Sequence, residues 1–110
     1  MAYDEELAYR IREVLGREPD LAEKAMFGGL GFMLGGRMAV AAGSKGVLMV
    51  RIDPADGEDL VDGDLVRFVE MRGREMRGWI DVHPEAIDTD EQLAAFVGRG
   101  AAYVRSLSDA

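Results

Sequence analysis

The one histidine, His83, is the side chain best suited to move protons near neutral pH, and two carboxylates stand close to it in the sequence. Asp81 and His83 are two positions apart, so in a strand both side chains would point to the same face. The chain has no cysteine, and no serine is placed to complete a nucleophilic triad. There is no second histidine and no metal-ligand spacing. We therefore predict no catalytic residue, no metal ligand and no bound cofactor, and we interpret His83 as a surface residue at a strand end.

A run of acidic residues is the second candidate for chemistry. Residues 53–64 hold six acidic side chains and no basic one. A calcium loop of the EF-hand type needs an oxygen ligand at its third position and a bidentate glutamate at its twelfth. Counted from Asp53, these positions hold Ala55 and Asp64, so the motif fails. A solvated acidic helix face is the better interpretation.

Three arginines and an aromatic residue follow this acidic run: Arg72, Arg74, Arg77 and Trp79. Arginine beside an exposed aromatic ring can bind an anion, a nucleic-acid backbone or an acidic protein segment, including that of a second copy of the chain. Glu70 and Glu75 are equally available as local ion-pair partners, and a tryptophan at the start of a strand commonly belongs to the core. Both interpretations, interaction surface and local pairing, stay open.

Five glycines lie among large apolar residues in residues 26–36. Exposed backbone N–H groups in such a segment could bind phosphate, but neither of the standard glycine-rich phosphate motifs is present. We expect the glycines to form a turn or a bulge, or to leave room for an aromatic ring from a neighbouring element. If the segment contacts a partner directly, Phe27, Phe32 and Met33 are the expected contact residues.

Composition and charge limit the remaining classes. The 110 residues suit one domain, which we place at residues 1–110, and no segment approaches the roughly 20 apolar residues of a membrane helix. The acidic N-terminus does not resemble a signal peptide, and the absence of cysteine agrees with a cytoplasmic protein. A net charge of -8 argues against the chain as a whole binding nucleic acid.

The pattern of apolar residues predicts the elements that must position these groups. Helical spacing covers residues 3–16, capped near Asp4. An extended segment from residue 24 meets a return strand at Gly35-Gly36, a two-residue hairpin turn. A third strand at residues 47–52, apolar enough to be buried on both faces, is followed by a short helix that begins at Asp53-Pro54. Two more strands are expected at residues 65–70 and 79–83.

The last element is a helix that opens with a capping box, Thr89 and Gln92. Its apolar stripe is Leu93, Phe96, Val97, Ala101, Val104 and Leu107. The order α-βββ-α-ββ-α predicts an α+β, two-layer domain, with an antiparallel sheet of about five strands packed by helices on one face.

Four segments in this order resemble the N-terminal domain family of TfoX (Sxy), the bacterial competence regulator. They are Met26-Phe27-Gly28-Gly29-Leu30-Gly31-Phe32 with Met38-Ala39-Val40, then Leu48-Met49-Val50-Arg51, then Met76-Arg77-Gly78-Trp79, and finally Gly100-Ala101-Ala102-Tyr103-Val104-Arg105-Ser106-Leu107. The resemblance implies a secretion-chaperone-like α+β fold and a regulatory or protein-interaction role without enzymatic activity. We do not expect this chain to contain the C-terminal helical domain of the competence regulators. The resemblance therefore does not predict a role in DNA uptake.

Two function hypotheses from different classes result. The first is a non-enzymatic regulatory domain acting through an unidentified protein partner or through a second copy of itself. The alternative is an anion- or nucleic-acid-binding module that uses the arginines between Arg72 and Arg77. An enzyme acting on a small molecule is the third and least supported hypothesis.

Overall fold

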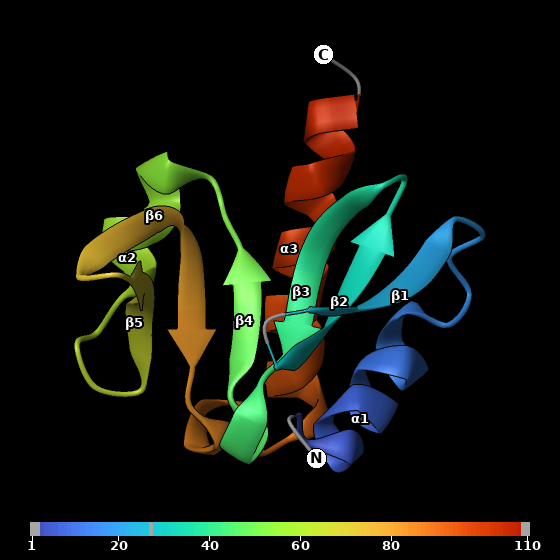
Figure 1. Ribbon diagram of the computed structural model, residues 1–110, viewed down its shortest axis with the longest axis horizontal. Helices are drawn as coiled ribbons and strands as arrows, with labels where there is room; N and C mark the ends of the chain where they lie inside the picture. Colours follow the sequence, from blue (N-terminus) through green and yellow to red (C-terminus); the bar gives the residue numbers. More distant parts are fainter. Residues whose placement is uncertain (1–2, 27, 109–110) are drawn as a thin grey trace.

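The computed structural model describes residues 3–26 and 28–108 (Figure 1). The helices are α1 (Glu5–Leu15), α2 (Gly57–Leu60) and α3 (Asp90–Ser108). The strands are β1 (Leu21–Met26), β2 (Gly29–Leu34), β3 (Arg37–Ala42), β4 (Leu48–Arg51), β5 (Val66–Met71) and β6 (Arg74–Val82). Short 3₁₀ turns occupy Ser44–Gly46, Pro54–Asp56 and Pro84–Ile87.

The strands form one antiparallel sheet in the order β1-β2-β3-β4-β6-β5, which confirms the α+β class. The sheet has one strand more than expected. Residues from 24 to 34 were interpreted as a single extended segment, but the chain reverses at Gly28, whose φ is 76°, and β1 pairs with β2. Apolar residues lie on both sides of this turn in the sequence, so the pattern resembles one continuous extended segment.

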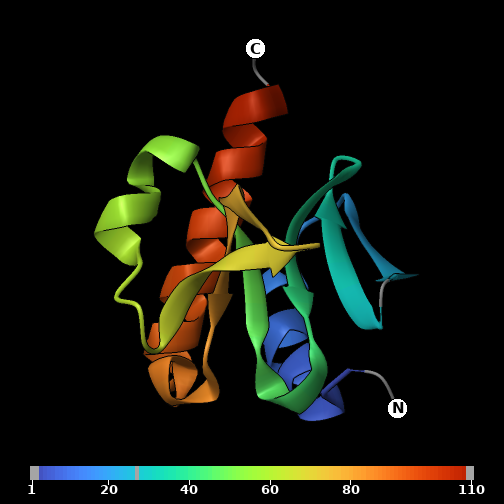
Figure 2. The ribbon, with the colours of Figure 1, turned by 60° about the vertical axis from the view of Figure 1, so that its left-hand side comes forward.

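One face of the sheet holds the core, and α1 and α3 cover it (Figures 1 and 2). Val40, Val50 and Ile80 point from the central strands into this layer and are fully buried. They belong to one apolar cluster with Leu93 and Val97 of α3. The predicted apolar stripe of the last helix is therefore the surface that packs on the sheet.

The expected helix starts are confirmed at the level of single hydrogen bonds. The Asp4 carboxylate accepts from the Leu7 N–H at 2.9 Å and begins α1. Thr89 and Gln92 form the reciprocal capping box, with the Thr89 N–H donating to Gln92 Oε1 at 2.9 Å and the Gln92 N–H donating to Thr89 Oγ1 at 3.1 Å. Asp53 caps the turn that precedes α2. These local signals fixed where the helices begin.

Strand β4 corrects one expectation. Leu48 and Val50 are buried, but Met49 and Arg51 are half-buried, so β4 is not buried on both faces. Met49 lies on the face opposite the core, and within the described residues no helix covers that face. We call it the open face of the sheet.

The hairpin formed by β5 and β6 bends sharply at a break in its register. Phe68 pairs with Ile80, whereas the next residue, Val69, pairs with Met76. The three intervening residues of β6 have no partner on β5, and the Gly78 carbonyl instead accepts from the Ile52 N–H at 2.9 Å. Residues 69–76, which we call the hairpin arm, therefore leave the plane of the sheet (Figure 2).

Candidate functional site

A groove of about 380 Å³ lies between the hairpin arm and the open face. Its apolar walls come from three strands, with Met38 on β3, Met49 on β4 and Met71 on the arm. Further lining residues are Gly28, Gly29, Ala41, Gly43, Ser44, Val47, Val69, Glu70 and Asp81. Because methionine is unbranched and polarizable, such walls can adapt to apolar side chains of different shape. We call this feature the methionine groove.

Two buried apolar residues, Ala41 and Val69, line the groove outside the main core cluster. Ala41 is 5% exposed and Val69 is 6% exposed, yet neither belongs to the main core cluster. Val69 reaches this position only because the register break turns the arm over the open face. Gly31 contributes by its lack of a side chain, since a Cβ there would lie 2.5 Å from the sulfur of Met38. Of the roles expected for the glycines, Gly35-Gly36 forms the turn, and the room left at Gly31 is taken by a methionine and not by an aromatic ring.

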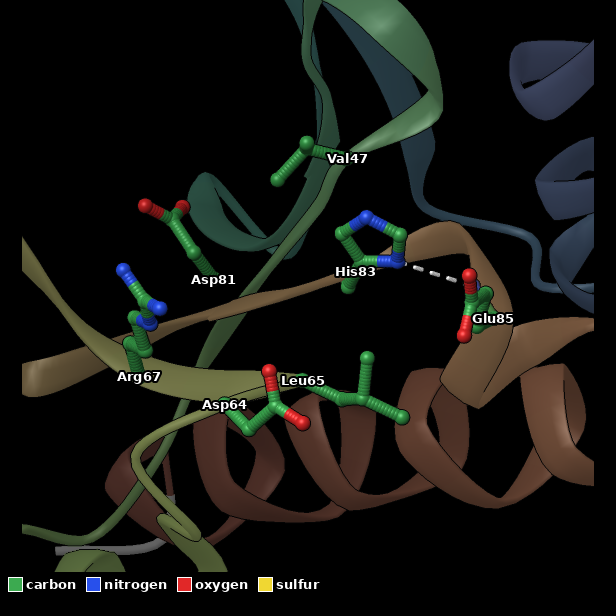
Figure 3. Close-up of a pocket in the computed structure, with 7 residues that line it drawn as sticks. All are labelled: Val47, Asp64, Leu65, Arg67, Asp81, His83 and Glu85. Carbon is green, nitrogen blue, oxygen red and sulfur yellow. Dashed lines mark hydrogen bonds between the residues drawn. The ribbon is translucent and has the colours of Figure 1, made fainter.

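A second, polar hollow of about 460 Å³ adjoins the groove (Figure 3). Arg67 and Asp81 lie at one end, and His83 and Glu85 lie at the other. Val47 and Asp81 line both the hollow and the groove. Asp81 therefore stands at the boundary between an apolar wall and a polar one.

The Asp81 carboxylate is half-buried and makes no hydrogen bond or ion pair within residues 3–26 and 28–108. Burial raises the pKa of Asp81, because partial removal from water disfavours the charged carboxylate and no donor offsets that cost. Arg67 is its partner in the pairing of β5 with β6, but the two side chains are not within ion-pair distance. Asp81 is thus an unsatisfied acceptor beside an apolar groove.

His83 lies on the surface at the end of a strand, as predicted. It is exposed directly after β6, and its Nδ1 accepts from the Glu85 N–H at 3.2 Å, which caps the following turn (Figure 3). Within the described residues no group of three or more histidine, cysteine or acidic side chains is arranged to hold a metal ion. The ring nitrogen used in the cap gives His83 a structural role.

The arginine cluster divides into paired and free members. Arg77 forms ion pairs with Glu58 at 3.1 Å and Glu75 at 3.3 Å, and its guanidinium lies 4.9 Å from the Phe68 ring centre. Arg77 therefore has the local pairing that the sequence offered as one interpretation, and the acidic run supplies one of its partners within the same copy. Arg72 and Arg74 lie exposed at the tip of the arm, without an ion pair in the described part of the chain.

Of the three expected contact residues in the glycine-rich hairpin, the structure corrects one. Phe32 is fully buried in the core, with the Arg12 guanidinium 6.0 Å from its ring centre, so it presents no surface to a partner. Met33 is half-buried on β2, and Phe27 lies outside the described residues. Trp79 is half-buried, opposite Arg51 in the pairing of β4 with β6. Phe32 is buried in the core because alternate residues of β2 point toward the helices.

The groove residues Met38, Met49 and Met71 were not proposed as a site from the sequence. One signal was present, since the chain contains seven methionines and Met49 alternates with the core residues Leu48 and Val50. The bend that brings Met71 over β3 and β4 had no such signal. Within the part of the chain described by the structure, no helix is long and apolar enough to cross a membrane.

Comparison with protein families gives a match to the TfoX N-terminal domain over residues 13–103. Searches of curated proteins and of solved structures gave no significant match. The matched region begins within α1 and extends into α3, so it includes the whole sheet, the hairpin arm and the methionine groove. The chain belongs to the TfoX N-terminal domain family.

Proposed function

We propose that this domain is a non-catalytic regulatory module that binds a segment of a protein partner in the methionine groove. The observation that carries the proposal is that Ala41 and Val69 are buried in the groove, outside the main core cluster. Apolar residues that are buried outside the core, beneath a groove open to solvent, are typical of a binding site. Membership of the TfoX N-terminal domain family supports a regulatory role.

The hairpin arm offers a matched pair of positions for testing this proposal. Met71 is 42% exposed and Met76 is 39% exposed, and both belong to the arm. Only Met71 lines the groove. A photo-crosslinking residue such as p-benzoylphenylalanine, placed at one position or the other in the native host, therefore samples the groove or the opposite strand of the same hairpin.

We expect a discrete crosslinked product from position 71 and little or none from position 76. The product from position 71 should decrease when Met49→Gln makes the groove wall polar while keeping the side chain's length. Mass spectrometry then identifies the crosslinked protein, and the complex is rebuilt from purified components. Equal yields from the two positions, or no product from position 71, would contradict the proposal.

Anion binding at the tip of the arm is a second candidate, favoured by the exposure of Arg72 and Arg74. Because Arg77 is held by two glutamates, only two of the three arginines remain available for a phosphate backbone. Two contacts predict weak binding with a shallow dependence on salt. Titration of a fluorescent oligonucleotide at low salt, with Arg72→Gln and Arg74→Gln combined as the control, tests this candidate; no binding by the native chain would end it.

A further inference from the structure

Asp81 is the feature of the groove that an apolar partner alone would leave unexplained. It lines the groove beside Met49 and Val47, is half-buried, and has no partner in residues 3–26 and 28–108. An uncompensated carboxylate at such a position lowers stability, and an apolar ligand that covered it would increase the cost. A ligand that places a cation beside Asp81 would remove this cost.

The charges around Asp81 also favour a cationic ligand. The polar hollow on its other side holds Asp64 and Glu85 together with Arg67 and His83, and Glu70 borders the groove. The methionine groove itself is lined by no basic residue of the described chain. The net charge of -8 adds a long-range attraction for a basic partner.

Resting on the proposed function, we propose that the partner segment carries a lysine or arginine among apolar residues and that its cation pairs with Asp81. The aliphatic stem of such a side chain packs along the methionines, while its charged end reaches the carboxylate. The apolar neighbours of the cation occupy the groove between Met38 and Met71. The same arrangement disfavours a nucleic-acid backbone, because phosphate and Asp81 repel each other.

Within the described residues, Arg67 is the basic residue that pairs with Asp81 across the sheet. It lines the polar hollow and does not line the groove. If Arg67 competes for Asp81 in solution, Arg67→Gln should strengthen binding of the cationic segment.

The experiment begins with a random peptide library displayed on phage and selected on the purified full chain. We expect the selected peptides to be enriched in lysine or arginine flanked by apolar residues. The best peptide is then synthesised in two forms, one with its cation and one in which norleucine replaces lysine or citrulline replaces arginine. The second form removes the charge from the ligand and leaves the protein unchanged.

Binding is measured by calorimetry for the native chain, for Asp81→Asn and for Asp59→Asn. Asp59 is an exposed carboxylate of α2 that lines neither the methionine groove nor the polar hollow, so its substitution is a control for net charge. We expect Asp81→Asn to weaken the cationic peptide about tenfold and the neutral peptide less than about twofold. Asp59→Asn should change either affinity by less than about twofold.

Methyl signals of ¹³C-labelled methionine show where the peptide binds, with Met38, Met49 and Met71 assigned by substitution. Two results would overturn the role of Asp81 and leave the groove as the binding site. The first is that the selected peptides shift these signals but are not enriched in lysine or arginine. The second is that Asp81→Asn weakens the cationic and the neutral peptide equally. If no peptide is selected, or if the selected peptides leave the three signals unchanged, the peptide-binding groove itself is wrong.

Discussion

Gly31 on β2 and the thioether of Met38 on β3 occupy adjoining space on the open face, where a Cβ at position 31 would approach the Met38 sulfur to 2.5 Å. The absent side chain lets Met38 lie over the strand and form one wall of the methionine groove. The glycine therefore acts on the groove through a neighbouring side chain.

Gly31→Ala should displace Met38 and weaken binding in the groove. Because the displaced atom belongs to a flexible side chain, the free energy of unfolding should fall by no more than about 1 kcal/mol, measured by urea denaturation. In a Met38→Ala background the same substitution should have almost no effect, since the crowded sulfur is gone. A full and equal loss in both backgrounds would show that the strand backbone, which lies 3.4 Å away at the Lys24 carbonyl, is what resists the added methyl group.

Asp81→Asn should stabilise the fold at pH 7 while weakening the cationic partner. The pKa of Asp81 is raised by burial, so between the ordinary aspartate pKa and this raised pKa the folded chain binds a proton that the unfolded chain has lost. Stability contributed by this group is therefore lost as the pH rises above the ordinary aspartate pKa of about 3.9. Urea midpoints should be higher for Asp81→Asn than for the native chain at pH 7 and should converge below about pH 3.5.

Asp59→Asn is the control for this pH dependence and should show no comparable gain. A lower midpoint for Asp81→Asn at pH 7 would mean that the carboxylate stabilises the free protein, with Arg67 as the first partner to test. The expected combination of higher stability and weaker binding is typical of a binding residue, because such residues are placed for the ligand at some cost to the fold.

Two glycines of α3 predict opposite effects of the same substitution. Gly98 has open space where a Cβ would stand, so Gly98→Ala should raise the free energy of unfolding by about 0.5–1 kcal/mol through helix propensity. At Gly100 a Cβ would lie 2.5 Å from the Ala39 carbonyl oxygen and 3.1 Å from Val40 Cγ1. Because backbone cannot move aside cheaply, Gly100→Ala should cost about 1–3 kcal/mol.

Chemical denaturation of the two variants in parallel measures this difference. Equal stability changes in the two variants would show that α3 does not pack against β3 as closely as described. The pair thus tests the helix-on-sheet contact independently of any ligand.

Arg105 joins α3 to the segment before β1 and predicts a loss of stability in acid. Its guanidinium donates to the Asp20 carboxylate at 2.8 Å and to Glu18 at 3.0 Å, and this pairing lowers the pKa of Asp20. The contribution is present above the ordinary aspartate pKa of about 3.9 and is lost as the pH falls through the lowered value. Arg105→Gln should therefore reduce the urea midpoint at pH 7, and the difference should vanish in strong acid.

Arg99→Gln provides the comparison on the same helix, because Arg99 is exposed and makes no ion pair within the described residues. It should leave the midpoint nearly unchanged at both pH values. Molar salt should also shrink the effect of Arg105→Gln, since the pairs are partly exposed. An effect that is unchanged by acid and salt would assign Arg105 a packing role.

Features that depend on near neighbours in the chain could be predicted from the residues alone. Asp4, Thr89 and Gln92 specify helix starts because a cap is made within three residues, and Gly35-Gly36 specifies a turn through its backbone freedom. The apolar stripe of α3 determined the face that the helix packs on the sheet, because side-chain direction follows the period of the helix, whereas residues 47–52 were wrongly expected to be buried on both faces. The family was also determined by its sequence, as the match over residues 13–103 shows.

Which of these residues form a site depends on how the strands pair and bend in three dimensions. Met71 and Met38 stand 33 positions apart in the numbering, and they line one groove because β6 loses its register beside Val69 and turns the arm over the open face. No local pattern encodes that bend, since it depends on a long-range hydrogen bond from the Ile52 N–H, just after β4, to the Gly78 carbonyl. The environment of Asp81 was decided in the same way, because the burial of a carboxylate and the distance to its nearest cation exist only after the strands have paired.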